Sequence, residues 1–175
     1  MIKLYFREIE EAKSNSNTLT NHFIGDYLKT GIKCFQIGKS EHGKPYLIDH
    51  PNIHFNISHT GNAFVCALAD EPVGVDIETE KRFHKGIARK FFTVDEQKYV
   101  FDKPNRQHER FTEIWVKKEA YVKWLGLGLS MPFYSFDVLE DRRIKVYRIG
   151  KYIIGICSDA ICRLNKEFAI EICSG

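Results

Sequence analysis

The sequence lacks the features that mark secreted, membrane-bound or nucleic-acid-binding proteins. Its 175 residues contain no apolar run of membrane-spanning length. The first residues have neither the apolar core nor the small-residue cleavage site of a signal peptide. The net charge is only +3, which is too weak to indicate a nucleic-acid partner but is compatible with an acidic protein partner. We therefore expect a protein that binds neither membranes nor nucleic acid. A cytoplasmic location and a monomeric state are further expectations.

Cysteine is present, but not in the patterns that build disulfides or zinc sites. The five cysteines are an odd number, form no Cys-x-x-Cys pair, and in four cases lie within apolar runs. Such cysteines are typical of buried thiols in a reducing compartment. We therefore expect free, buried thiols.

The chain has enough apolar residues to build a folded core. Hydrophobic residues make up 43% of the chain and aromatic residues 13%, against 28% charged residues, as in an ordinary globular domain. This length suits one domain or two small packed halves. The halves are expected at 1–80 and 81–175, each a small α+β unit, and they should share a seam.

Hydrophobic periodicity predicts the order of the elements. The predicted strands are 2–9, short segments within 33–48, 53–58, 63–69, 73–78, 133–139, 143–148, 151–157 and 167–172. The predicted helices are 17–30, 84–91, 93–102 and 106–125. Most candidate functional residues lie in the predicted strands before residue 80 and in the helix 106–125.

Asp76 and Glu78 are two carboxylates on the same predicted strand. Side chains alternate across a strand, so these two point to one face while Ile77 points to the other. Magnesium prefers oxygen ligands and often takes one or two carboxylates together with substrate phosphate oxygens. A solvent-facing acidic strand end has the same pattern and, for this pair alone, is the commoner explanation.

The helix predicted at 106–125 carries Trp115, Glu119 and Lys123 on one face, four residues apart. An exposed Glu–Lys pair of this spacing contributes only a few tenths of a kcal/mol. Large apolar neighbours indicate instead that this face is partly buried. Glu119 would then add a third carboxylate to a metal site, and Lys123 would neutralise a phosphate.

Three further segments have both an ordinary and a functional interpretation. Ser58 and His59 follow Asn56 at a strand exit, where they either form a hydrogen-bonded turn or bind phosphate. A Ser58–His59 nucleophilic pair is disfavoured because neighbouring strand side chains point to opposite faces. Gly43-Lys44-Pro45 alone is a turn with a charged tip, and Glu96 alone is an acid that suits a helix N-terminus.

Taken in order, these segments form a recognisable series. The series is Gly43-Lys44-Pro45, Phe55-Asn56-Ile57-Ser58-His59, Gly74-Val75-Asp76-Ile77-Glu78, Arg89-Lys90-Phe91-Phe92 with Glu96, Trp115-x-x-Lys118-Glu119-x-x-x-Lys123, and Gly126-x-Gly128-Leu129. It resembles the Sfp-type 4′-phosphopantetheinyl transferase family over about residues 20–136. Each motif alone is weak, whereas the combination is highly specific.

The resemblance implies a fold, a reaction and a set of ligands. It implies two α+β halves related by pseudo-twofold symmetry, with coenzyme A in the seam. The reaction transfers the 4′-phosphopantetheine arm to a serine of an apo acyl, peptidyl or aryl carrier protein and releases adenosine 3′,5′-bisphosphate. Mg²⁺ would be held by Asp76, Glu78 and Glu119 together with the pyrophosphate of coenzyme A.

The resemblance also implies roles for individual residues. Lys44 and Pro45 would lie near the adenine and 3′-phosphate end of coenzyme A, and Ser58 and His59 near its phosphates. Lys123 would contact the pyrophosphate, with Lys118 close by. His22 falls where a phosphate-contacting residue is expected, although residues 8–17 contain only one basic residue, Lys13, where larger relatives have a basic segment.

The base and the reaction class have open alternatives at this point. Glu119 is the first candidate for the base that deprotonates the carrier serine, and Glu96 is the second candidate, for base or for positioning. Three carboxylates also suit a Mg²⁺-dependent nuclease or phosphatase, and a non-catalytic carrier-binding protein is a third possibility. Tyr121, Phe133 and Tyr134 are candidate carrier contacts, although core packing is the commoner role of such residues.

Overall fold

The structure is a computed structural model that describes residues 1–175 except 11, 32–33, 81–82, 164–170 and 175. Its strands are β1 (Ile2–Glu8), β2 (Ile37–Lys39), β3 (Pro45–Leu47), β4 (His54–Thr60), β5 (Ala63–Ala69), β6 (Gly74–Thr79), β7 (Ile144–Ile149), β8 (Tyr152–Cys157) and β9 (Glu171–Ser174). Its helices are α1 (Ser16–Tyr27), α2 (Lys85–Phe91), α3 (Val94–Phe101), α4 (Gln107–Leu125) and α5 (Asp159–Arg163), with 3-10 turns η1 (Pro104–Arg106), η2 (Gly128–Ser130) and η3 (Phe133–Ser135). Within these described residues, no helix combines the length and apolarity needed to cross a membrane.

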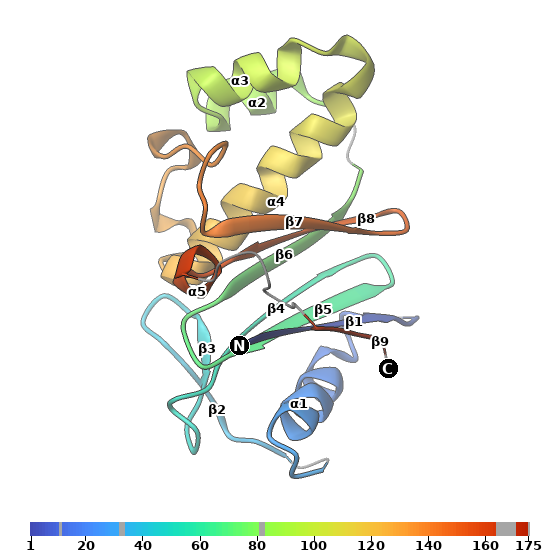
Figure 1. Cartoon of the computed structure of the whole chain (residues 1–175), viewed down its shortest axis with the longest axis vertical. Coiled ribbons are helices and arrows are strands. Elements are labelled where there is room, and N and C mark those ends of the chain that lie inside the picture. Colours follow the sequence, from blue (N-terminus) through green and yellow to red (C-terminus); the bar gives the residue numbers. More distant parts are fainter. Residues whose placement is uncertain (11, 32–33, 81–82, 164–170, 175) are drawn as a thin grey trace.

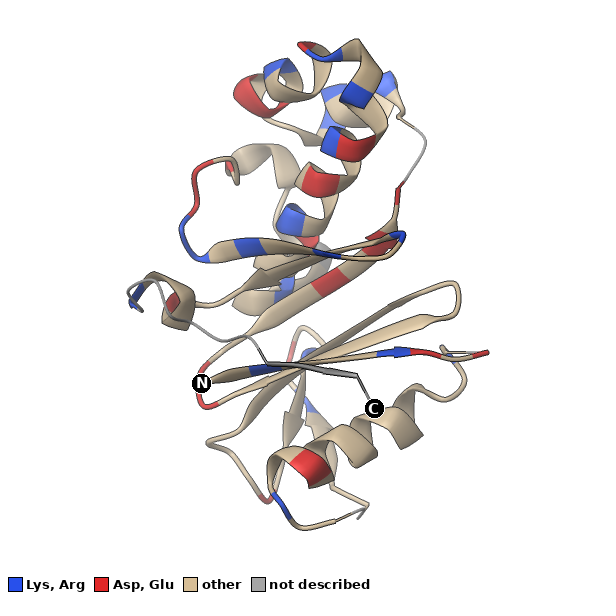
Figure 2. Ribbon diagram, turned by 45° about the vertical axis from the view of Figure 1, so that its right-hand side comes forward, with Lys and Arg blue, Asp and Glu red and all other residues tan. Residues whose placement is uncertain are grey.

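Two stacked sheets lie between outer layers of helices (Figure 1). One sheet has the strand order β4-β5-β1-β9 and the other β6-β8-β7, while β2 and β3 form a separate hairpin. Helix α1 covers the outer face of the first sheet, and α4 covers the outer face of the second, with α2 and α3 packed near the far end of α4. Charged residues are frequent on the α2–α4 layer and rare on α1 (Figure 2). This arrangement of two sheet-and-helix halves confirms the predicted α+β fold class.

The side chains of β6 alternate between two faces, and this alternation determines where its carboxylates lie. Val75 and Ile77 are buried in the apolar core between the two sheets. Because side chains alternate along a strand, Gly74, Asp76 and Glu78 point to the opposite face, which α4 covers. The two carboxylates therefore lie against a helix and not on an open strand end.

Two glycines allow α4 to approach the sheet closely. A Cβ atom on Gly74 would lie 2.1 Å from the carbonyl oxygen of Ala120, and one on Gly155 would lie 2.5 Å from that of Val116. Gly155 is also the strand partner of Asp76 across the β6–β8 ladder. Backbone contact at these two points sets the distance between α4 and the strand that carries the carboxylates.

The segment predicted as a strand at 133–139 is instead the 3-10 turn η3 followed by irregular chain. The prediction fails because side chains satisfy this backbone in place of a neighbouring strand. The carbonyl oxygens of Phe133 and Phe136 accept hydrogen bonds from Lys118, and the N–H of Val138 donates to Glu96. The short helix α5 was not predicted at all.

The last strand links the two ends of the chain. β9 pairs in parallel with β1, with Lys3 opposite Glu171, and so extends the sheet of the first half. Most of the strand predicted at 167–172 lies outside the described residues. The division into 1–80 and 81–175 stays a prediction.

The prediction of buried thiols is correct for two cysteines and wrong for two. Cys66 and Cys157 are buried, whereas Cys34 and Cys162 are exposed, and all four are free thiols. Burial raises the pKa of the Cys66 and Cys157 thiols, so both stay protonated at neutral pH. Cys34 lies in irregular chain between α1 and β2, and Cys162 lies near the end of the short helix α5, so neither position is inside the core.

Replacing Gly155 with alanine should destabilise the fold, because the added methyl group would push α4 away from β8. We expect a loss of about 1–3 kcal/mol in the free energy of unfolding, measured by urea denaturation. Gly86→Ala is the matched control, since a Cβ at this position in α2 meets no atom within 4 Å. Removing a helical glycine there should stabilise by up to about 1 kcal/mol. Equal stability of Gly155→Ala and the unchanged protein would contradict the packing argument.

Candidate active site

Strands β4 and β6 and helix α4 bring polar side chains together at the seam between the sheets. The hydroxyl of Ser58 donates to Oδ1 of Asp76 at 2.8 Å. The ammonium of Lys123 donates to the same Oδ1 at 2.7 Å and to the Ser58 hydroxyl oxygen at 3.0 Å. Two residues further along β4 and β6, the hydroxyl of Thr60 donates to Glu78 at 3.0 Å. Residues from three separate sequence motifs thus meet in one cluster.

Asp76 is the most buried member of this cluster. It is only 5% exposed, and its Oδ2 atom is buried without a hydrogen-bond partner among the described residues. A buried carboxylate oxygen is costly to leave unpaired, and nearly all such atoms in folded proteins have a partner. Oδ2 of Asp76 is therefore an oxygen donor available to a cation.

Roles were predicted from the sequence for Ser58 and His59 in this segment, but none for Asn56 and Thr60. Asn56 is 5% exposed, and its side-chain oxygen accepts a hydrogen bond from the N–H of Val75 at 2.9 Å. This bond attaches the edge of β4 to the edge of β6. Asn56 was already part of a quoted motif, and the position of Thr60 two residues after Ser58 was the available signal that both point to the same face.

A pocket of about 240 Å³ lies beside the cluster and is lined by two lysines. Lys44 and Lys123 line it together with Pro45, Asn56 and glycines that include Gly126. The ammonium of Lys44 donates to the carbonyl oxygen of Trp124 at 2.7 Å, near the end of α4. Burial lowers the pKa of Lys44 to about 8. Two ammonium groups in one small pocket suit an anion such as a phosphate.

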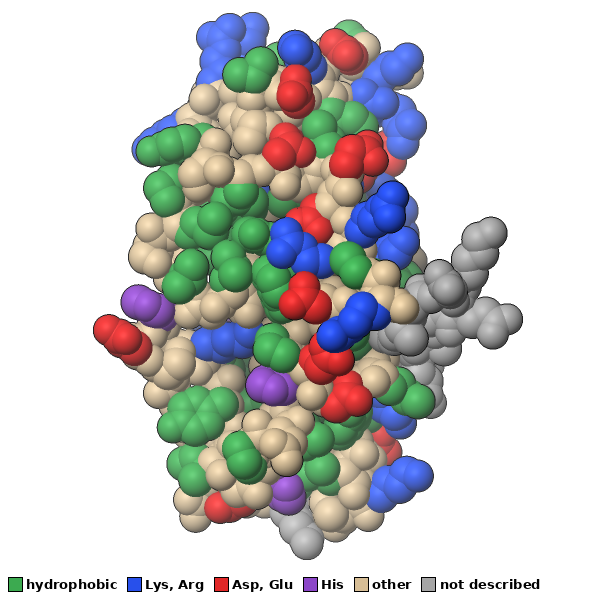
Figure 3. Space-filling model, turned by 60° about the vertical axis from the view of Figure 1, so that its left-hand side comes forward, with side chains coloured by type: hydrophobic (Ala, Val, Ile, Leu, Met, Phe, Trp, Pro, Cys, Tyr) green, Lys and Arg blue, Asp and Glu red, His purple; other side chains and the backbone are tan. Residues whose placement is uncertain are grey.

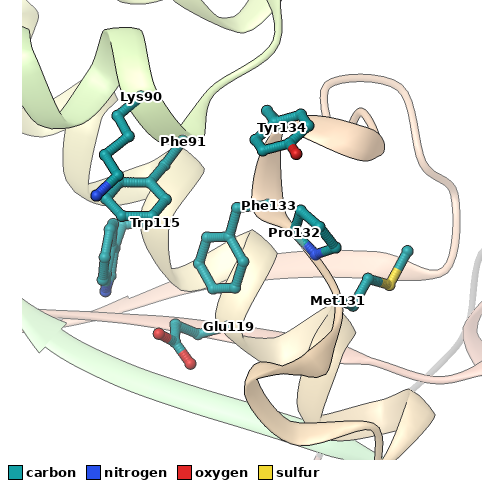
Figure 4. Close-up of a pocket in the computed structure, with 8 residues that line it drawn as sticks. All are labelled: Lys90, Phe91, Trp115, Glu119, Met131, Pro132, Phe133 and Tyr134. Carbon is teal, nitrogen blue, oxygen red and sulfur yellow. The ribbon is translucent and has the colours of Figure 1, made fainter.

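A second pocket, of about 310 Å³, is mainly apolar. Figure 3 shows the face that carries residues 131–140, where hydrophobic side chains gather beside acidic and basic ones. The pocket walls include Phe91, Trp115, Met131 and Phe133. Glu119 lies beneath the rings of Trp115 and Phe133 (Figure 4), so a carboxylate borders an otherwise apolar cavity.

Lys118 and Glu96 are placed differently from the prediction. We expected Lys118 to bind the cofactor and Glu96 to serve as a second candidate base. Both are 0% exposed, and they form an ion pair with each other at 2.9 Å. A side chain without exposed surface does not touch a substrate, so the structure gives this pair a role inside the protein.

The two predicted histidines do not join the Asp76 cluster. His59 is exposed and, as the neighbour of Ser58 on β4, points to the opposite face of that strand. His22 lies on α1, which is separated from β6 by the first sheet (Figure 1). Contacts of both histidines with a phosphate stay predictions.

Comparison with known sequences decides the family. A sequence profile of the 4′-phosphopantetheinyl transferase superfamily matches residues 72–173. A second profile, described as 4′-phosphopantetheinyl transferase, N-terminal, matches residues 2–72. The chain belongs to the 4′-phosphopantetheinyl transferase superfamily. The predicted family resemblance is thus confirmed.

Individual relatives carry the same family name. The chain is 35% identical over 147 residues to 4′-phosphopantetheinyl transferase ffp of Bacillus subtilis, covering 82% of this chain and 66% of the relative. It is 38% identical over 125 residues to 4′-phosphopantetheinyl transferase Sfp of Bacillus subtilis strain 168, covering 66% of this chain and 56% of the relative. It therefore spans less than two-thirds of the length of these relatives.

Among solved structures, the chain is similar to the holo-[acyl-carrier-protein] synthase of Thermotoga maritima. The TM-score is 0.42 and the sequence identity 18%, and the match covers 49% of this chain and 60% of that one.

Replacing Asn56 with alanine should destabilise the seam, because the buried N–H of Val75 would lose its acceptor. A buried, unsatisfied donor costs about 1–3 kcal/mol, and we expect a loss of that size in urea denaturation. Asn52→Ala, in the exposed turn before β4, serves as the control and should stay within about 0.5 kcal/mol of the parent protein. Indistinguishable stabilities for the two variants would show that Asn56 does not hold the strands together.

Proposed function

We propose that this chain transfers the 4′-phosphopantetheine arm of coenzyme A to a serine of an apo carrier protein. The observation that carries the proposal is one turn of α4 that borders two unlike pockets. Glu119 lines the apolar pocket, and Lys123 lines the lysine-rich pocket. Four helical residues span about 6 Å along the axis. A molecule with a phosphorylated end and a long uncharged arm, as in coenzyme A, suits two such neighbouring pockets.

The carboxylates at the seam suit a Mg²⁺ ion. Asp76 offers an unpartnered buried oxygen, Glu78 follows it on the same face of β6, and Glu119 lies on the helix that covers this face. Among the described residues, no three His, Cys, Asp or Glu side chains by themselves form a metal site. Mg²⁺ usually takes one or two protein carboxylates and completes its coordination with substrate phosphates and water, so the unpartnered oxygen of Asp76 is the observation that supports the proposal. When bound, the ion would neutralise charge on the phosphate oxygens.

Lys123 supplies positive charge at the same point. Its ammonium lies 2.7 Å from Asp76 and also borders the lysine-rich pocket. A flexible lysine in that position can turn from the carboxylate to the pyrophosphate when coenzyme A enters. Phosphoryl transfer depends mainly on such charge neutralisation and on in-line positioning.

The remaining steps concern the carrier serine. Its hydroxyl oxygen forms a bond to the phosphorus that bears the pantetheine arm. The bond from that phosphorus to adenosine 3′,5′-bisphosphate breaks, and the bisphosphate leaves. Glu119 is our first candidate to accept the serine proton, because its carboxylate borders the pocket assigned to the arm.

The proposed partner is an acidic carrier protein, and we propose that the chain meets it as a monomer in the cytoplasm. Support comes from the distribution of charge, because most lysines and arginines follow residue 80. Many of them lie on the helical layer that Figure 2 shows at one end of the molecule. Residues after 80 carry more lysines and arginines than acidic residues, and such an excess steers an acidic partner toward that part of the chain. Free thiols in the described cysteines are consistent with a reducing compartment.

The transfer itself is tested by incubating the protein with coenzyme A, Mg²⁺ and several apo carriers and weighing the carriers by mass spectrometry. We expect each accepted carrier to gain one phosphopantetheine arm. Asp76→Ala should slow the reaction by about 10²-fold or more, because it removes the buried oxygens at the seam. Asp95→Ala changes an exposed acid on α3 and should leave the rate unchanged.

No mass gain on any carrier would refute the transferase proposal, and full activity of Asp76→Ala would refute the metal assignment. A Mg²⁺-dependent nuclease or phosphatase would not need coenzyme A. Failure to bind coenzyme A in calorimetry, together with phosphate release from other esters, would favour that alternative. A non-catalytic carrier-binding protein would bind the carrier and leave its mass unchanged.

Binding of coenzyme A should weaken as the pH rises through about 8. The pKa of Lys44 is lowered to about 8, so its ammonium is present below that pH and is lost above it. Calorimetric titrations between about pH 7 and 9.5 should show this loss of affinity. Lys44→Arg keeps its positive charge over this pH range, so its affinity for coenzyme A should not fall as the pH rises. Lys44→Met should bind weakly throughout, and an unchanged pH dependence in both variants would exclude Lys44 as its source.

A further inference from the structure

The buried pair of Lys118 and Glu96 is not used by the proposed chemistry. Lys118 lies one residue before Glu119 on α4 but points into the protein, where it is 0% exposed. Its ammonium lies 2.9 Å from Glu96 and donates to the carbonyl oxygens of Phe133 and Phe136 at 2.6 Å each. These three contacts use all three N–H donors of the ammonium.

Glu96 connects the same pair to two more backbone positions. One of its oxygens accepts a hydrogen bond from the N–H of Thr93 at 2.8 Å, as part of the capping box that begins α3. The other accepts from the N–H of Val138 at 2.9 Å. The pair therefore joins the start of α3, the middle of α4 and the segment 133–138.

The segment 133–138 forms one wall of the apolar pocket. Phe133 and its neighbour Tyr134 line the cavity from this side, and Figure 4 shows Phe133 facing Trp115 and Phe91 across it. The ring centroids of Phe133 and Trp115 are 5.7 Å apart. This segment is not a strand, and its backbone is bonded to α4 and α3 through Lys118 and Glu96. Ring packing of Phe136 on Tyr121, with centroids 4.6 Å apart, adds to these directional bonds.

A stability role alone does not account for a charged pair at this place. Desolvation opposes the burial of an ammonium and a carboxylate, and apolar replacements of a buried pair are often as stable as the original. Burial lowers the pKa of Lys118, which is the direction that this desolvation favours. Charged side chains form directional hydrogen bonds to specific carbonyl and N–H groups, and apolar side chains do not.

We propose that Lys118 and Glu96 are positioning residues that hold segment 133–138 at the distance from Trp115 that the arm of coenzyme A requires. The inference rests on the proposed function, which assigns the arm to the apolar pocket. Neither residue touches the substrate. The pair acts through the Phe133 wall, so it should affect recognition of the arm and leave recognition of the phosphates unchanged.

The test compares two ligands in the double variant Lys118→Met/Glu96→Gln, by calorimetry on the full chain. Removing both charges leaves no unpaired ion, and glutamine still serves in a capping box, so the variant should fold. Adenosine 3′,5′-bisphosphate, which lacks the arm, should bind within about twofold of its original affinity. The affinity for coenzyme A should fall by about tenfold or more, because the contacts between the arm and the Phe133 wall would be weakened.

Lys117→Met/Glu113→Gln is the matched control, because it removes another ion pair of α4, at 3.0 Å and near the surface. It should change neither affinity. Amide hydrogen exchange adds a readout that needs no ligand: residues 133–138 should exchange faster in the Lys118→Met/Glu96→Gln variant, while β6 and β8 should exchange as before.

Each outcome separates the inference from the function on which it rests. If the unaltered protein binds coenzyme A no better than the bisphosphate, the assignment of the arm to this pocket fails, and the inference fails with it. If the unaltered protein prefers coenzyme A and the double variant keeps that preference, the proposed function stands and the positioning role is refuted. Equal loss of both ligands would also refute it, since that result indicates a contact with the phosphates or general disruption.

Discussion

The contact of α4 with the β6–β8 sheet is the constraint on which the site depends. Side chains normally separate a helix from a sheet, but here Gly74 and Gly155 allow backbone to touch backbone. With that separation removed, Lys123 on the helix reaches Asp76 on the strand at 2.7 Å. The same approach places Glu119 over a strand that carries two further carboxylates. The two glycines thus set the distances between the functional side chains of α4 and those of β6.

Side-chain hydrogen bonds join the two sheets where no backbone ladder does. Asn56 on β4 bonds to the backbone of β6, and Ser58 and Thr60 on the same strand bond to Asp76 and Glu78. The candidate active site is therefore also one of the places where the two halves are attached, beside the apolar core between the sheets. A ligand bound there contacts both halves at once, and its binding energy contributes to holding them together.

Much of this arrangement was predictable from the sequence, and the remainder has a physical explanation. Alternation along β6 correctly placed Asp76 and Glu78 on one face, because periodicity reports direction. The sequence motif on α4 could not show that Lys118, one residue before Glu119, points inward. A motif gives the spacing of residues but not their depth of burial. The strand expected at 133–139 failed for a related reason. Its apolar pattern is real, but its backbone bonds go to Lys118 and Glu96, which lie far from it in sequence.

The parallel pairing of β1 with β9 has a consequence for the order in which the molecule assembles. β1 lies between β5 and a strand more than 160 residues further along the chain. Contacts of such long range close late, because the entropy of a long loop must be lost before they form. While a ribosome is still making the chain, one edge of β1 remains open to pairing with other strands. The sheet that contains β1, the first strand of the chain, is therefore completed only when β9 is available.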